Sequence, residues 1–175
     1  EFIRIFHLDC GRKYFTVQQI KDIIDQLAAN HYTHIELAFG NDGFRFLLDE
    51  NTLGDITVEG KTYTAKAINE AIHNANVAYC EYKTGSYELT QSDMDEIITY
   101  ATQKGIGVIP LLNIPGHTNT LVNAMSTLGV PVSPFVSNTN SKGYPTKAFD
   151  VDNEATVAFV EAFVAKYVEY FGSKG

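Results

Sequence analysis

The chain has 175 residues, of which 45% are hydrophobic and 19% charged, and its formal net charge is −8. This composition is typical of one packed globular domain. An acidic chain repels phosphate backbones, so we expect no nucleic-acid partner. No run of about 18 consecutive apolar residues occurs in it, so we expect no insertion into a membrane.

The amino-terminal part has the pattern of two strands with a helix between them. Residues 2–8 are rich in β-branched and aromatic side chains, which is typical of a strand. From Thr16 onward apolar residues recur at helical spacing, with polar residues on the opposite side, which predicts an amphipathic helix. Residues 34–39 form a second predicted strand, which ends in a Gly-Asn-Asp-Gly turn.

A long insertion is predicted after the second strand, over about residues 44–90. Within it, residues 56–63 have the pattern of a hairpin, and Glu59-Gly60 supplies the turn. Residues 65–78 have the weaker pattern of a helix.

The remaining sequence predicts three helices and one strand. The first helix begins at an N-cap residue, for which both Thr90 and Ser92 are suitable. Residues 107–112 form the third strand of the series, where Pro110 is tolerable at a bulge or beside an irregular neighbour. The last two helices are predicted over about residues 118–128 and 153–171, with a loop over 129–147 between them.

Strands that alternate with helices indicate βαβ units and a parallel sheet, and therefore an α/β fold. A complete (β/α)8 TIM barrel needs eight strands and roughly 200 residues at least. We therefore expect residues 1–175 to be the amino-terminal part of such a barrel, with its first three to four βα units.

Polar residues next to glycine follow each of the predicted strands, at residues 9–15, 40–45 and 113–117. In these barrels the working residues lie at the carboxyl ends of the strands. Polar groups that converge on one barrel mouth suit a small polar substrate such as a sugar.

Each candidate residue also has a purely structural interpretation. Arg12 suits a surface ion pair, and Asp42 suits a turn in which its side chain bonds to local backbone. His117 suits the start of a helix, bonded to a backbone group. Glu36 lies within a strand, so it needs a partner inside the barrel or a strand face that is open to water.

Motifs for other chemistries are absent from the sequence. It contains no dinucleotide-binding or Walker loop, no H-E-x-x-H and no G-x-S-x-G, and its histidines lack the spacing of zinc ligands. We therefore expect no metal and no cofactor. Cys10 and Cys80 fit two reduced thiols, with a disulfide as the alternative.

Taken together, the three strand ends resemble family 20 glycoside hydrolases, the β-N-acetylhexosaminidases. Residues 9–15 resemble the D-x-x-R-x-[FY] segment of that family, residues 41–45 its D-D-Q-G-W-R segment, and residues 113–118 its D-x-P-G-H-T segment. The likeness extends over residues 3–171 and is greatest to surface-attached hexosaminidases of Gram-positive bacteria and to lacto-N-biosidases.

The sequence departs from the family pattern at several of these positions. Asn41 and Asn113 stand where the family commonly has aspartate, Phe44 where it has tryptophan, and Glu36 where histidines are usual. The adjacent Asp-Glu pair that follows the fourth strand of the family is not in these residues, and the chain has no tryptophan.

The resemblance implies a retaining hydrolysis of terminal β-linked N-acetylhexosamine, in which the substrate's own acetamido oxygen attacks the anomeric carbon. It implies that Arg12 holds the O3 and O4 hydroxyls and that Asp42 and His117 support the acid Glu. Asn113 would then donate a hydrogen bond to the catalytic Asp.

The resemblance also bears on location and on the behaviour of the isolated chain. It implies an extracellular or cell-wall protein of a Gram-positive bacterium. Alone, the chain is expected to be inactive and to self-associate through exposed strand edges.

Two rival functions stay open at this point. One is a noncatalytic carbohydrate-binding or adhesive module. The other is a different barrel hydrolase such as a deacetylase, although such enzymes usually need metal ligands.

Overall fold

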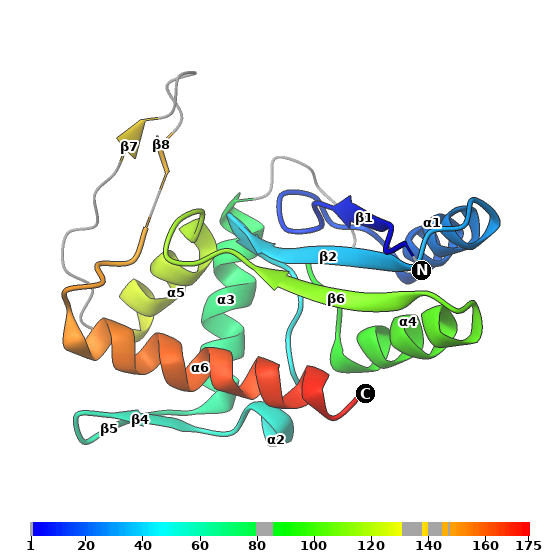
Figure 1. The fold of residues 1–175 in the computed structure, drawn as a ribbon. Helices are drawn as coiled ribbons and strands as arrows, with labels where there is room; N and C mark the ends of the chain where they lie inside the picture. Colours follow the sequence, from blue (N-terminus) through cyan, green and yellow to red (C-terminus); the bar gives the residue numbers. More distant parts are fainter. Residues whose placement is uncertain (1, 80–85, 131–137, 140–144, 147) are drawn as a thin grey trace.

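The computed structural model in Figure 1 describes residues 2–79, 86–130, 138–139, 145–146 and 148–175. The helices are α1 (Val17–Ala29), α2 (Glu50–Leu53), α3 (Ala65–Tyr79), α4 (Gln91–Gln103), α5 (Asn119–Leu128) and α6 (Glu154–Gly172). The strands are β1 (Ile5–Leu8), β2 (His34–Asn41), β3 (Gly43–Phe44), β4 (Ile56–Val58), β5 (Lys61–Tyr63), β6 (Gly107–Leu112), β7 (Asn138–Thr139) and β8 (Pro145–Thr146).

The central sheet is built from three parallel strands, with β2 between β1 and β6. Its register places His7, Glu36 and Ile109 side by side. Parallel strands end at the same edge of a sheet, so the segments that follow β1, β2 and β6 come together there (Figure 1). The predicted α/β fold with parallel strands is confirmed.

Helices α1 and α4 pack against each other and against the sheet, as Figure 1 shows. Their apolar stripes are buried, at Ile20, Ile24 and Leu27 in α1 and at Met94, Ile97 and Ala101 in α4. Each begins at a threonine whose hydroxyl accepts from the backbone N–H three residues on, in a capping box. Thr16 and Thr90 are these caps, so Ser92 is not the N-cap of α4.

Between β2 and α4 the chain forms β3, α2, the β4–β5 hairpin and α3. The hairpin turns at Glu59 and Gly60, as predicted, and α3 matches the predicted helix. Two elements were not predicted: β3 pairs antiparallel with the end of β2, and α2 is a single turn. Strand β3 directs the chain away from the sheet toward α6.

A cluster of aromatic rings attaches this region to α6. Phe39 at the end of β2 lies 5.6 Å from Phe44 and 5.4 Å from Phe46, measured between ring centroids. Tyr167 of α6 packs against all three, at 5.2 to 5.9 Å. Its buried hydroxyl donates to the Phe46 carbonyl oxygen at 2.9 Å. The cluster therefore fixes the path of the chain immediately after the second strand.

The prediction is confirmed for β6, α5 and α6. The predicted loop over 129–147 lies mostly outside the described residues, and within it β7 pairs antiparallel with β8, which was not predicted. Pro110 pairs with Leu37 just before a register shift, which is the irregular setting that proline needs. Cys10 is a buried free thiol, and Cys80 lies outside the described residues. None of the described helices is both long and apolar enough to cross a membrane.

Glu36 is not an isolated buried carboxylate. Its Oε1 lies 2.7 Å from His7 Nδ1 on the adjacent strand, and a quarter of its side chain is exposed. Both of the settings expected for it thus apply in part, because it has a partner and its strand face is partly open to water.

Candidate active site

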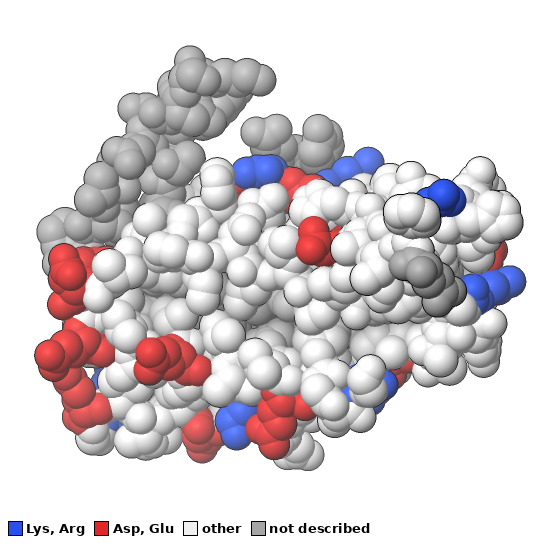
Figure 2. Space-filling view, in the orientation of Figure 1, with Lys and Arg blue, Asp and Glu red and all other residues white. Residues whose placement is uncertain are grey.

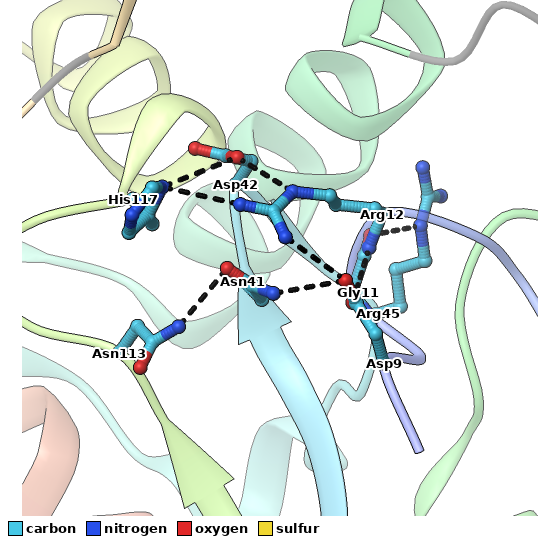
Figure 3. Close-up of polar contacts among 8 residues, drawn as sticks. All are labelled: Asp9, Gly11, Arg12, Asn41, Asp42, Arg45, Asn113 and His117. Atoms are coloured by element: carbon cyan, nitrogen blue, oxygen red, sulfur yellow. Dashed lines mark hydrogen bonds and ion pairs between the residues drawn. The ribbon is translucent and has the colours of Figure 1, made fainter. Parts of the chain in front are cut away.

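Three side chains from three strand ends meet at one edge of the sheet, as Figure 3 shows. Arg12 follows β1, and its Nε donates to Asp42 Oδ2, which follows β2, at 3.0 Å. Arg12 Nη2 lies 3.3 Å from Nδ1 of His117, which follows β6. The structure therefore brings together the Arg12, Asp42 and His117 that the sequence singled out.

The loop that carries Arg12 is organised by Asp9. Asp9 Oδ1 accepts from the backbone N–H groups of Gly11 and Arg12 at 3.2 and 3.1 Å. Its Oδ2 accepts from Arg12 Nη1 at 3.1 Å. Burial alone acts to lower the pKa of Arg12, but its hydrogen bond to Asp42, with the charges of Asp42 and Asp9, outweighs this and raises the pKa. Arg12 is thus a fixed cation between two carboxylates, with nearly half of its side chain exposed.

Two glycines let this loop approach the second strand end. A Cβ on Gly11 would lie 2.5 Å from the backbone nitrogen of Asn41, and a Cβ on Gly43 would lie 2.2 Å from the Gly11 carbonyl oxygen. That oxygen accepts from Nε of Arg45 at 2.6 Å, while Arg45 Nη1 donates to the Tyr87 carbonyl oxygen. The fully buried Arg45 guanidinium therefore holds the Arg12 loop against the segment that leads into α4.

Asp42 and His117 are coupled through their backbones. Both adopt left-handed conformations, with φ of 60° and 54°. The Asp42 N–H donates to the His117 carbonyl oxygen at 2.7 Å, and the Asp42 carbonyl oxygen accepts from Thr120 N–H at 2.8 Å. The side chain of Asp42 contacts Arg12 and not its local backbone, so the turn-residue interpretation is wrong. The His117 side chain likewise faces the site and does not bond to the start of α5.

The ring of His117 has two competing partners. Its Nδ1 lies 3.3 Å from Arg12 Nη2 and 3.5 Å from Asp42 Oδ2. A guanidinium can only donate, so the contact with Arg12 requires Nδ1 to be the unprotonated nitrogen. A protonated Nδ1 would instead donate toward Asp42. The proton position on this ring thus decides which of the two neighbours it bonds to.

Asn113, the fourth predicted site residue, lies beside this group and not within it. Its Nδ2 donates to Oδ1 of Asn41 at 2.9 Å, and Asn41 Nδ2 donates to Asp9 Oδ2 at 3.0 Å. The structure therefore places Asn113 at the same edge as Arg12, joined to it through two further side chains (Figure 3).

Several residues of the site were not predicted, namely Asp9, Asn41 and Arg45. Asp9 precedes Gly11 by two residues, the spacing of an Asx turn, and this signal was available in the sequence. Tyr79, at the end of α3, is close enough to respond to the site: burial raises its pKa and the charge of Asp42 adds to the rise. In the described part of the chain no three His, Cys, Asp or Glu side chains are grouped so that they could hold a metal ion.

Known proteins are similar to this chain in sequence. The family model described as "Glycosyl hydrolase family 20, catalytic domain" matches residues 3–174. A β-hexosaminidase of Vibrio furnissii is 29% identical over 119 residues, which are 67% of this chain and 18% of that protein. A β-hexosaminidase of Vibrio vulnificus is 28% identical over 134 residues, 70% of this chain and 14% of that protein.

Solved structures agree with these matches. The structure of tandem GH20 catalytic modules in the pneumococcal exo-β-D-N-acetylglucosaminidase StrH is 37% identical, with a TM-score of 0.86 over 98% of this chain and 40% of that one. The GH20 β-N-acetylhexosaminidase from Streptomyces coelicolor A3(2), at 23% identity and a TM-score of 0.62, shares the fold over 95% of this chain and 30% of that one. The chain therefore spans less than half the length of these relatives.

Proposed function

Because this chain belongs to glycosyl hydrolase family 20, we propose that it is the amino-terminal part of a β-N-acetylhexosaminidase barrel. The parent protein would hydrolyse terminal β-linked N-acetylhexosamine from glycans without a metal or cofactor. Residues 44–90 would be an insertion after the second strand of that barrel. The observation that carries the proposal is the meeting of Arg12, Asp42 and His117 at the carboxyl ends of three parallel strands.

The roles of these residues follow from their chemistry. A guanidinium offers two parallel N–H donors, which suits the adjacent O3 and O4 hydroxyls of a terminal sugar. Asp42 and His117 would orient and tune an acid Glu, supplied by sequence outside these 175 residues. That Glu would protonate the leaving oxygen and then activate water, while the substrate's acetamido oxygen attacks the anomeric carbon.

The test compares the 175-residue chain with the complete reading frame that contains it. With a chromogenic N-acetylglucosaminide, we expect turnover by the complete protein and none by the chain alone. In the complete protein, Arg12→Ala should raise KM strongly, because the hydroxyl contacts are lost. Exposed Lys66→Ala, on the outer face of α3, is the control. Hydrolysis by the isolated chain would refute the fragment part of the proposal, and an unaffected Arg12→Ala variant would refute the assigned role.

The cellular location of the parent enzyme is a separate part of the proposal. We propose an extracellular or cell-wall location in a Gram-positive bacterium, supported by the 37% identity to the pneumococcal enzyme. Cell fractionation with an antibody against this chain tests it, since activity confined to the cytosol would contradict it. Assays on lacto-N-biosides and N-acetylglucosaminides side by side would show which sugar leaves.

We further propose that the isolated chain self-associates. Strands β1 and β6 each pair on one side within the described sheet. Beside β6, an apolar groove runs along α6, lined by Ile114, Val160, Val164, Ala165 and Val168 together with Glu161 and Glu169. Figure 2 shows that this face is largely uncharged, with acidic side chains gathered near the amino-terminal end of α6 and the β4–β5 hairpin.

Unpaired edges and an exposed apolar face favour association. Light scattering should show species larger than a monomer at high concentration. Val168→Glu should reduce their amount, because Val168 is 66% exposed in this groove. A purely monomeric chain at all concentrations would contradict this proposal.

A further inference from the structure

The peptide group that joins Gly11 to Arg12 is held at both of its polar ends. Its carbonyl oxygen accepts from Nε of the buried Arg45 at 2.6 Å (Figure 3). Its N–H, which belongs to Arg12, donates to Asp9 Oδ1 at 3.1 Å. Because a peptide group is planar, hydrogen bonds to both of its polar ends fix its rotation about the chain direction. That rotation sets the direction in which the Arg12 side chain leaves the backbone.

Arg45 can act as the fixed partner in this contact because its own position is set elsewhere. Its backbone N–H donates to the Phe39 carbonyl oxygen at 2.9 Å, and its backbone carbonyl oxygen accepts from the Leu89 N–H at 2.8 Å. Its Nη1 donates to the Tyr87 carbonyl oxygen at 2.8 Å, and only 1% of the residue is exposed. These three contacts do not involve the Arg12 loop. Arg45 is therefore attached to β2 and to the segment before α4, and the loop is what it holds.

The contact needs the shape of a guanidinium. Nε and Nη1 belong to one planar group and donate to two different carbonyl oxygens, those of Gly11 and Tyr87. Arg45→Lys would keep the charge but would offer one nitrogen at the end of a flexible chain. Gly43 closes the space from the side of β3, since a Cβ there would lie 2.2 Å from the Gly11 carbonyl oxygen and 3.1 Å from Arg45 Nε. This carbonyl group is thus confined between a rigid donor and the backbone of β3.

A small rotation of this peptide group would be amplified along the Arg12 side chain. The guanidinium lies at the far end of that side chain, where Nε donates to Asp42 at 3.0 Å and Nη2 lies 3.3 Å from His117 Nδ1. Hydrogen bonds weaken steeply as they are stretched or misaligned. Misplacement of a group that positions a substrate by about 1 Å can cost about 100-fold in rate. The position of the Gly11 carbonyl oxygen should therefore matter for any ligand that Arg12 binds.

We propose that Arg45 is a positioning residue for Arg12: by holding the Gly11 carbonyl oxygen, it sets where the Arg12 guanidinium is presented to the substrate. Arg45 is itself buried, so its effect on the reaction passes through Arg12. That the substrate is a terminal N-acetylhexosamine rests on the proposed function. The control of the Arg12 loop by Arg45 does not.

A double-mutant cycle in the complete protein tests this dependence. Arg45→Lys should raise KM for a chromogenic N-acetylglucosaminide by about ten- to hundredfold and change kcat less, since Arg12 is still present but misplaced. In an Arg12→Ala background the same change should alter KM by less than about twofold, because the residue that Arg45 positions is gone. A residue that only supports the fold would give the same factor in both backgrounds. Arg4→Lys, the same chemical change on an exposed arginine, is the matched control and should leave KM unaltered in both.

The second readout reports on the loop itself and needs no substrate. Cys10 directly precedes Gly11 and is 3% exposed. Labelling of its thiol at pH 8, followed by mass spectrometry of the peptide that contains it, should be at least about tenfold faster in Arg45→Lys and Arg45→Met than in wild type. The increase should hardly depend on urea below the unfolding transition, because a local opening exposes little surface.

The sign of this labelling change separates exposure from charge. Burial raises the pKa of Cys10, and the positive charge of Arg45 is among the influences that oppose the rise. Loss of that charge in Arg45→Met would by itself raise the pKa further and slow the labelling. Faster labelling of this variant therefore reports a loop that has opened.

Gly43→Ala displaces the same carbonyl oxygen without changing Arg45, and it supplies a second cycle if the Arg45 variants do not fold. Its effect on KM should also disappear in the Arg12→Ala background. Equal KM factors in the two backgrounds, or labelling of Cys10 as slow in the Arg45 variants as in wild type, would overturn the proposal. If the wild-type protein does not hydrolyse the substrate, the proposed function is refuted, and the labelling alone decides whether Arg45 controls the loop.

Discussion

Asn76 of α3 should be one of the most sensitive positions for stability. It is fully buried, and its Oδ1 accepts from the Phe44 N–H at 2.9 Å while its Nδ2 donates to the Phe44 carbonyl oxygen at 2.6 Å. One side chain thus satisfies both backbone groups of a buried residue in β3. Asn76→Ala would leave a donor and an acceptor without partners.

The expected cost can be worked out from these two bonds. An unsatisfied buried backbone group costs about 1–3 kcal/mol, so the two groups together predict a loss of about 2–6 kcal/mol. A water that enters the vacated space would bring the loss toward the lower end. Asn76→Asp should cost more at neutral pH, because it keeps the acceptor for the N–H but directs a carboxylate at the carbonyl oxygen.

Urea unfolding of the chain at low concentration, followed by far-UV circular dichroism, measures this loss. Asn74→Ala is the control, since Asn74 is exposed on the same helix and its replacement should change stability by less than about 0.5 kcal/mol. A loss below about 1 kcal/mol for Asn76→Ala would show that the backbone of β3 does not depend on this amide.

Three further outcomes follow from the structure. Gly43→Ala should destabilise the chain and raise KM in the complete protein, because the new methyl carbon would lie 2.2 Å from a backbone oxygen of the Arg12 loop. Burial raises the pKa of the Cys10 thiol to about 12, so in a Cys80→Ser variant a thiol reagent at pH 8 should react after unfolding and not before. A hydrogen bond from Tyr100 lowers the pKa of Asp25 below 3.8, so Asp25→Asn should destabilise at pH 7, and this cost should disappear as the pH falls through the folded-state pKa. Equal reactivity of Cys10 in the folded and unfolded protein would contradict the second outcome. A loss of stability for Asp25→Asn that does not depend on pH would contradict the third.

Much of the fold could be predicted from the sequence because its main signals are local. Periodic apolar residues and the caps Thr16 and Thr90 define α1 and α4 within one or two residues. Strand β3 could not be found in this way, since it has two residues and exists because Asn76 and α6 hold it. Its stability comes from long-range contacts that no local pattern records.

The same division applies to the site. The polar residues after each strand predicted where Arg12, Asp42 and His117 would meet, because parallel strands end at one edge. The structural role of Arg45 was not predicted, because a buried arginine that donates to two carbonyl oxygens produces no periodic pattern in the sequence. The donor direction through Asn41 was also missed, since it depends on the partner at each end and not on residue type.

The left-handed backbone at residues 42 and 117 limits how this protein can change over evolutionary time. Side chains other than Gly, Asn, Asp and His rarely tolerate such φ values, and β-branched ones least of all. Few residue types can therefore replace Asp42 and His117, whatever reaction they serve. In a lineage that lost the activity, we expect Arg12 to change first, because its backbone carries no such restriction, while positions 42 and 117 stay within Gly, Asn, Asp and His.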